Sequence, residues 1–165
     1  MADPHVAAPH LSAGPATGAI VPGGARFVFI AHVFFDDLDA MRMLHNSRYG
    51  VMAERANSAF FEANGWRWEP DPANNPDQFY AVREQTIRYL EPIREPGDVA
   101  VEMWVAELGR SSATYRFRVR SLDASHAHAD IQRVQVKLSP ATLRPTPWSP
   151  LLRAQLETLL TPDQA

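Results

Sequence analysis

The sequence predicts an α+β domain in which one long helix packs against an antiparallel sheet. Two observations predict this class: apolar residues recur at helical spacing over 46–64, and the residues that follow alternate with a period of two. Only the helix has an apolar stripe wide enough to fill a concave sheet face, so we expect the sheet to curl around it. A chain of 165 residues suits one such domain with one core.

Residues 1–25 are expected to form a flexible arm, because they hold four prolines, four glycines and a single charged side chain, Asp3. A strand that wraps a partner subunit is the alternative for this segment. The main domain is expected over 26–140 and starts with the run RFVFIAHVFF, which favours a strand buried on both faces. Residues 141–165 are expected to form a C-terminal extension with a short helix.

The long helix is predicted over 46–64, with Asn46 or Ser47 as its N-cap and Gly65 at its end. Its apolar stripe consists of Tyr49, Met52, Ala53, Ala56, Phe60 and Ala63. Strands are predicted over 78–90, 99–106, 113–120 and 129–139, and LGRSS is the hairpin connection between the second and third of them. The last of these strands places Val134, Val136 and Leu138 on one face.

Composition excludes several classes of function. The chain has no cysteine, which removes disulfides, thiolate metal sites and a cysteine nucleophile. Its formal net charge of −3 provides no basic field for nucleic acid. No apolar run is long enough to span a membrane and no secretory signal is present, so we expect a cytoplasmic protein. His126 and His128 alone are weak evidence for a metal, and neither a metal nor a bound cofactor is expected.

The segment DDLDAMRMLHNSRY, residues 36–49, is the candidate for chemistry. It places three carboxylates just before the start of the long helix, where unpaired N–H groups can polarise a carbonyl oxygen. A carboxylate there can attack a carbonyl or activate water. Acidic residues that simply complement the helix dipole are the structural alternative.

The stretch FFDDLDAMRMLHNSRYGVMAERANSAFFEANGW resembles the opening motif of the hotdog-fold acyl-CoA thioesterases of the 4-hydroxybenzoyl-CoA thioesterase type. The later segments IRYLEPI, GD and ELGRSS match the second half of that family in order and spacing. The resemblance covers about residues 27–140. It implies a hotdog fold, in which a curved antiparallel sheet of about five or six strands wraps a long central helix, and it implies hydrolysis of an acyl-CoA or acyl-carrier-protein thioester.

The resemblance also implies roles for individual residues. Asp39 matches the nucleophile or general base, and the backbone N–H of Asn46 matches the donor to the thioester oxygen. Asp37, His45 and Glu54 are weaker catalytic candidates, since each has a structural reading as well. Candidate contacts to the CoA moiety are Arg88, Arg110, Ser111 and Ser112.

The family pairs two such units into a larger sheet, so a homodimer or homotetramer is expected. Two departures from the family pattern bear on substrate identity: Arg42-Met43 replaces a Gly-His pair, and His45 replaces the first asparagine of an Asn-Asn pair. Trp66 and Trp68, which follow the helix, either line an acyl pocket or cap the core.

Two other functions remain open from the sequence. A binding or scaffold protein for acyl thioesters would lack hydrolysis, and the Arg42-Met43 replacement supports it. A hotdog enoyl-thioester hydratase or dehydratase needs a catalytic histidine paired with an acid on the helix. His45 is the only histidine near the long helix, which argues against this function.

Overall fold

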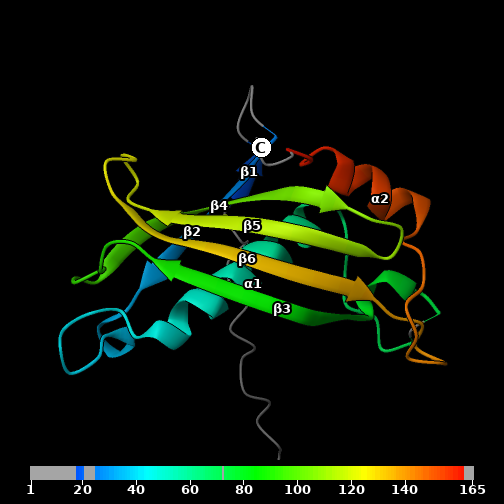
Figure 1. Ribbon diagram of the computed structural model, residues 1–165, viewed down its shortest axis with the longest axis horizontal. Helices are drawn as coiled ribbons and strands as arrows, with labels where there is room; N and C mark the ends of the chain where they lie inside the picture. Colours follow the sequence, from blue (N-terminus) through cyan, green and yellow to red (C-terminus); the bar gives the residue numbers. More distant parts are fainter. Residues whose placement is uncertain (1–17, 21–24, 72, 162–165) are drawn as a thin grey trace, which may run out of the picture.

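The chain folds into a six-stranded antiparallel sheet that curves around one long helix. This computed structural model describes residues 18–20, 25–71 and 73–161. The elements are β1 (Gly18–Ile20), β2 (Phe27–Val33), η1 (Phe35–Asp37), α1 (Asn46–Ala63), η2 (Pro76–Gln78), β3 (Tyr80–Tyr89), β4 (Gly97–Leu108), β5 (Ser112–Arg120), β6 (Ala127–Lys137) and α2 (Pro150–Glu157). The strand order is β1-β2-β4-β5-β6-β3, so β3 forms one edge (Figure 1).

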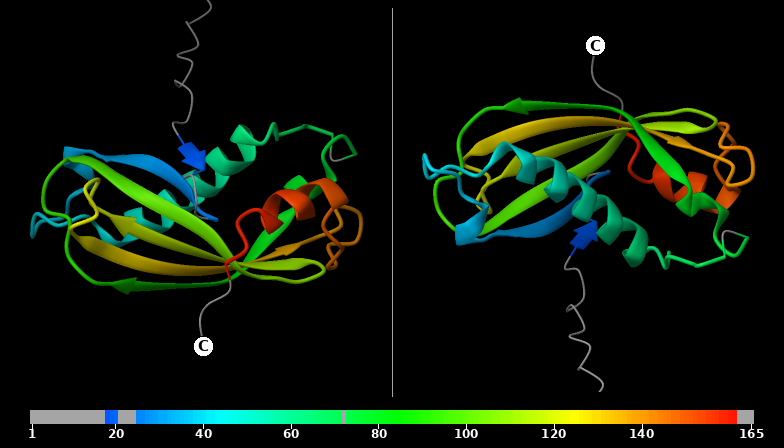
Figure 2. Two further views of the ribbon diagram at one scale, coloured as in Figure 1. Left: turned by 90° about the horizontal axis from the view of Figure 1, so that it is seen from above. Right: turned by 90° about the horizontal axis from the view of Figure 1, so that it is seen from below.

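Helix α1 lies along one face of the sheet, as the two views of Figure 2 show. The apolar stripe of α1 is buried there against the inner residues of β2, β4 and β5, and Phe27 and Phe60 meet edge to face with ring centroids 5.6 Å apart. This arrangement confirms the predicted α+β class and the wrapped-helix architecture of the hotdog fold.

The ends of α1 are fixed by local hydrogen bonds. The N-cap is His45, whose ring nitrogen accepts from the Ser47 N–H, so the predicted caps Asn46 and Ser47 lie one and two residues too far along the chain. At the other end Gly65 has a φ of 82°, which glycine adopts without steric cost. Its N–H donates to Glu62 O and the Trp66 N–H donates to Phe61 O, the paired bonds of a Schellman motif.

Strand β2 is buried on one face only, contrary to the sequence prediction. Phe27, Ala31 and Val33 face the core, whereas Ile30 is 36% exposed. The prediction of a strand buried on both faces failed because hydrophobic residues occur on both faces of β2, so the sequence shows no period of two.

Strand β6 turns its polar residues toward α1. Arg133, Gln135 and Lys137 are buried on the inner face, and Val134 and Val136 belong to the outer face. The sequence correctly grouped the valines on one face. Each polar residue on the other face has a polar partner: Arg133 contacts Glu54 of α1, Gln135 contacts Asn57 of α1, and Lys137 contacts Asp77 of η2.

The C-terminal helix α2 closes the end of the sheet beyond the C-terminus of α1. Leu152, Leu156 and Leu159 are buried in the common core, and the Val105 N–H donates to Leu159 O at 2.9 Å. Most of the expected arm over 1–25 lies outside the described residues, apart from β1, which pairs with β2. Among the residues described, no helix is long and apolar enough to cross a membrane.

Candidate active site

The loop before α1 is organised by the side chain of Asp39. Its Oδ1 accepts from the N–H groups of Met41 at 2.8 Å and Met43 at 3.1 Å. Its backbone N–H and C=O also close the turn, with Met43 O at 2.8 Å and Arg42 N at 2.9 Å. Within the described chain no hydrogen bond reaches Oδ2, which leaves one oxygen of a half-buried carboxylate available for a substrate.

Arg42 stands where the resemblance places a glycine, and it adopts a backbone conformation that glycine favours. Its φ is 56°, in the left-handed region that side chains disfavour. This residue belongs to the tight turn in which the Arg42 N–H donates to Asp39 O. The Arg42 side chain is exposed.

The start of α1 is held against the loop and the sheet. The Leu44 N–H donates to Ile93 O at 2.8 Å, and the His45 N–H donates to Asp37 O at 3.0 Å. Asn46 follows as the first helical residue, and its N–H has no acceptor within the helix. A preorganised donor at the positive end of a helix dipole suits a carbonyl oxygen that gains negative charge.

Asp39 and Asn46 line the same cavity, which has a volume of about 450 Å³. Its walls are mostly apolar and come from the loop, the first turn of α1 and the end of β3. The lining side chains include Met41, Met43, Leu44, Tyr49, Tyr89 and Leu90. A volume of this size accommodates an acyl thioester group.

The sequence did not identify the part of this wall that β3 supplies. Tyr49 and Tyr89 meet edge to face with centroids 5.2 Å apart, which joins α1 to the end of β3. Burial raises the pKa of Tyr49 above its ordinary value, so its hydroxyl stays protonated at neutral pH. The only sequence signal for this part of the wall was the alternation of residues 78–90, which places Tyr89 on the same face as Ile87.

The weaker catalytic candidates have structural partners. Asp37 accepts from the Phe34 N–H at 2.9 Å and pairs with Arg48 at 2.9 Å, which ties η1 to α1. The His45 ring lines the cavity, but its Nδ1 is the cap of the helix. Glu54 lies two turns into α1 and pairs with the buried guanidinium of Arg133.

The four candidate CoA contacts do not gather at this cavity within one chain. Arg110, Ser111 and Ser112 form the β4–β5 turn at the far end of the sheet, where Trp148 donates to Ser112 O. Arg88 lies at the near end of β3, on the outer face, where it pairs in register with Asp130. It lines an outer groove of about 390 Å³ together with Trp104 and Arg118.

Arginines on the outer face of the sheet are largely engaged by acids. Arg118 makes two hydrogen bonds to Asp130, at 2.8 and 3.2 Å. Glu102 accepts from Arg120 at 2.6 Å and from Arg26 at 2.7 Å. Burial raises the pKa of Glu102, but these bonds outweigh it and hold the pKa below its ordinary value of 4.5.

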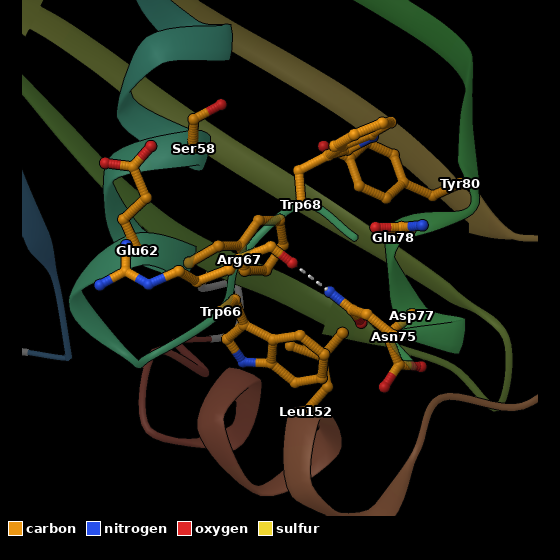
Figure 3. A pocket seen from close by; sticks show the side chains of 11 residues that line it. Ser58, Glu62, Trp66, Arg67, Trp68, Asn75, Asp77, Gln78, Tyr80 and Leu152 are labelled. Atoms are coloured by element: carbon orange, nitrogen blue, oxygen red, sulfur yellow. Dashed lines mark hydrogen bonds between the residues drawn. The ribbon is translucent and has the colours of Figure 1, made fainter. Parts of the chain in front are cut away.

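A second cavity, of about 200 Å³, lies at the other end of α1 and is shown in Figure 3. Trp68 and Tyr80 form one side and Trp66 the other, next to Leu152 of α2. Trp66 and Trp68 were read from the sequence as either pocket or cap residues, and both line this cavity. Over the described ranges, no group of three or more metal-ligating side chains occurs.

Comparison with known proteins finds a matching family. The family described as the thioesterase superfamily matches residues 41–126, which include Asn46 and strands β3, β4 and β5 but not Asp39. No curated protein matches the sequence significantly.

Solved structures share the fold. The PA5185 protein of Pseudomonas aeruginosa is 21% identical, with a TM-score of 0.73 over 83% of this chain and 93% of its own. The PA2801 protein of the same species is 26% identical, with a TM-score of 0.68 over 77% and 95%. A 1,4-dihydroxy-2-naphthoyl-CoA thioesterase from Synechocystis is 10% identical, with a TM-score of 0.69 over 79% and 95%. The resemblance read from the sequence is thereby confirmed.

Proposed function

Because the chain belongs to the thioesterase superfamily, we propose that it hydrolyses an acyl-CoA or acyl-carrier-protein thioester to the free acid and the thiol. The shared cavity is the observation that supports this most directly. Asp39 offers a free carboxylate oxygen and Asn46 offers an unpaired N–H at a helix start, and both line one apolar-walled space. A thioester carbonyl is complementary to that pair, since its carbon is attacked while its oxygen gains charge.

Two routes fit this arrangement. In the first, Asp39 attacks the carbonyl carbon, the C–S bond breaks, the thiolate leaves and takes up a proton, and water hydrolyses the resulting anhydride. In the second, Asp39 removes a proton from a water that attacks the same carbon. The Asn46 N–H donates to the carbonyl oxygen in both routes. Single-turnover hydrolysis in ¹⁸O-labelled water tests for the first route. Water that attacks the aspartyl carbonyl of the anhydride leaves its oxygen on Asp39, so label in Asp39 identifies that route, whereas the second route never labels Asp39.

A second copy of the chain is part of the proposal. Strand β3 is a ten-residue edge with an exposed row of backbone groups, and pairing with another β3 would satisfy them. The resulting homodimer, alone or doubled into a tetramer, would cover the open side of the cavity at Tyr89. It would also bring candidate CoA contacts from the partner toward the site, which one chain alone does not do.

The test is thiol release from a panel of acyl-CoA esters by wild type and Asp39→Asn. Asparagine keeps the Oδ1 acceptor that holds the loop, so we expect the fold to persist while kcat falls at least about 100-fold. The matched control is Asp36→Asn, which removes an exposed carboxylate from the same segment and should change kcat less than about twofold. Unchanged turnover in Asp39→Asn would remove Asp39 from the mechanism.

The same panel addresses the other functions. Tight binding of acyl-CoA esters without hydrolysis would identify a binding protein. Hydration of crotonyl-CoA would identify an enoyl-thioester hydratase, for which α1 supplies no histidine within its helical residues.

A further inference from the structure

The wall of the Asp39 cavity contains a second carboxylate, which the connection between β3 and β4 supplies. Leu90, Glu91 and Pro92 of this connection line the cavity together with the Asp39 loop and the first turn of α1. All three segments lie at the same end of the sheet (Figure 1). Neither hydrolytic route uses Glu91, so its place in the wall has another explanation.

Hydrogen bonds hold this part of the wall on two sides. The N–H groups of Leu90 and Glu91 donate to His128 O, at 2.9 and 3.3 Å, and His128 Nδ1 lies 3.2 Å from Glu91 O. On the other side, the Leu44 N–H donates to Ile93 O at 2.8 Å. The backbone at Glu91 is therefore fixed relative to both β6 and the start of α1.

The Glu91 side chain is held by a histidine. Its Oε2 lies 2.8 Å from Nδ1 of His126, which belongs to the connection between β5 and β6. The His126 ring offsets part of the Glu91 charge when it is protonated, and it leaves the full charge in place when it is neutral. The Glu91 side chain is 54% exposed, so water screens the field of its carboxylate without abolishing it.

The rest of the wall does not compensate the charges of Asp39 and Glu91. Among the residues that the structure describes, no lysine or arginine lines the cavity. The Nδ1 of His45 accepts from the Ser47 N–H, so this ring carries no positive charge. The other ionisable side chains of the wall are Tyr49 and Tyr89. The two carboxylates therefore give the cavity a negative electrostatic potential.

We propose that Glu91 is a specificity-determining residue through which the Asp39 cavity selects acyl groups by charge. The cavity accepts neutral and cationic acyl groups and rejects acyl groups that end in a carboxylate. This inference rests on the proposed function and names the substrate class for it. Its physical basis is Coulombic, because a fixed carboxylate in the wall repels a second carboxylate brought into the same mostly apolar space and attracts a cation.

The test uses three acyl-CoA esters whose acyl chains have closely similar shapes and differ in charge. Glutaryl-CoA ends in a carboxylate, 5,5-dimethylhexanoyl-CoA is neutral, and 4-(trimethylammonio)butanoyl-CoA carries a permanent positive charge. Thiol release gives kcat/KM for each ester at mildly alkaline pH, after subtraction of the rate without enzyme. For wild type we expect kcat/KM for glutaryl-CoA to be at least about tenfold below that for the neutral ester.

Glu91→Gln removes the charge and keeps the shape of the side chain. Relative to the neutral ester, we expect kcat/KM for glutaryl-CoA to rise about fivefold and kcat/KM for the cationic ester to fall about threefold. A shift of the wall would affect all three esters alike, so opposite changes for the two charged esters identify an effect of charge.

Glu95→Gln is the matched control. Glu95 is an exposed carboxylate of the same connection and does not line the cavity. Because solvent screens a charge outside the cavity, both ratios to the neutral ester should change less than about twofold in this variant.

The outcomes separate this inference from the proposed function. Asp39-dependent hydrolysis with equal efficiency for glutaryl-CoA and the neutral ester, or the absence of opposite changes in Glu91→Gln, would overturn selection by charge and leave the thioesterase proposal standing. Absence of hydrolysis of every ester by wild type would overturn the proposed function and this inference with it. Rejection of glutaryl-CoA together with opposite changes in Glu91→Gln supports both.

Discussion

Arg42 has a left-handed backbone conformation in the active-site loop. With a φ of 56° it occupies a region that costs a residue with a side chain roughly 1–2 kcal/mol relative to glycine. The loop keeps this geometry because two N–H groups converge on Asp39 Oδ1. The turn is thus specified by the aspartate, and the residue at its left-handed position contributes strain.

Arg42→Gly should therefore stabilise the protein. Relief of the strained φ outweighs the larger unfolded-state entropy of glycine, so we expect the free energy of unfolding to rise by about 0.5–1 kcal/mol. Urea unfolding measures this change. Arg42→Ala is the control, because alanine keeps the strain and should show no gain. If the glycine variant were no more stable than the alanine variant, strain at Arg42 would be the wrong explanation.

Some residues of the site could be predicted from the sequence, whereas contacts between residues far apart in the chain could not. Asp39 and Asn46 were predicted from the resemblance to the thioesterase family, because spacing alone indicated only carboxylates before a helix start, and the structure brings both residues to one cavity. The partners of Glu54 could not be predicted, since Arg133 lies 79 residues away and reaches α1 only after the sheet has curled. The wall at Tyr89 depends in the same way on long-range pairing.

At the scale of elements, α1 is fixed to the sheet by a polar contact as well as by its apolar stripe. Arg133 is 3% exposed, and its guanidinium donates to Gln85 at 2.7 Å, to Gly50 O at 3.1 Å and to Glu54. Gly50 permits this approach, because a Cβ there would lie 3.1 Å from the Gln85 amide nitrogen. Three elements, β6, β3 and α1, thus meet at one side chain near the helix start.

The helix, the hairpin and the run of strands were predictable because each depends on local periodicity and turn residues. The inner face of β6 was not, because burial of Arg133, Gln135 and Lys137 contradicts the usual preference for apolar residues under a helix. Each of these side chains has a polar partner on α1, β3 or η2, and those partners are distant in sequence.

On the outer face, Glu102 links β4 to β5 in a way that depends on pH. Its pKa in the folded protein lies below the ordinary value of 4.5, so its stabilising contribution is complete above that value and is lost as the pH falls through the folded pKa. We expect Glu102→Gln to lower the free energy of unfolding by about 1 kcal/mol at neutral pH. That difference should shrink as the pH is lowered below 4.5, which urea unfolding at neutral pH and at acidic pH would measure.

Glu107→Gln provides the control for this pH dependence, since Glu107 is an exposed residue of the same strand. It should alter the free energy of unfolding by less than about 0.5 kcal/mol at neutral pH. A Glu102→Gln deficit that persisted unchanged at acidic pH would show that packing of the side chain, and not its charge, stabilises the pair with Arg120.

At the scale of the whole molecule, β3 is a ten-residue edge of the sheet in one chain. In the proposed dimer this edge would pair with the same strand of the partner. Antiparallel pairing about Gln85, with Arg83 left in the bulge between Val82 and Glu84, would set Ala81 opposite the partner's Arg88 on the outer face, and the two-fold axis would repeat this contact. The register can therefore be tested through charge at one exposed position.

Ala81→Arg and Ala81→Glu form that test. Arginine would place like charges opposite each other twice, and glutamate would place opposite charges there, with each pair worth about 0.2–1 kcal/mol. We expect the dimer dissociation constant of the arginine variant to exceed that of the glutamate variant by about tenfold at low salt, and the gap to narrow in high salt. Sedimentation equilibrium measures both constants. Equal constants would exclude this register.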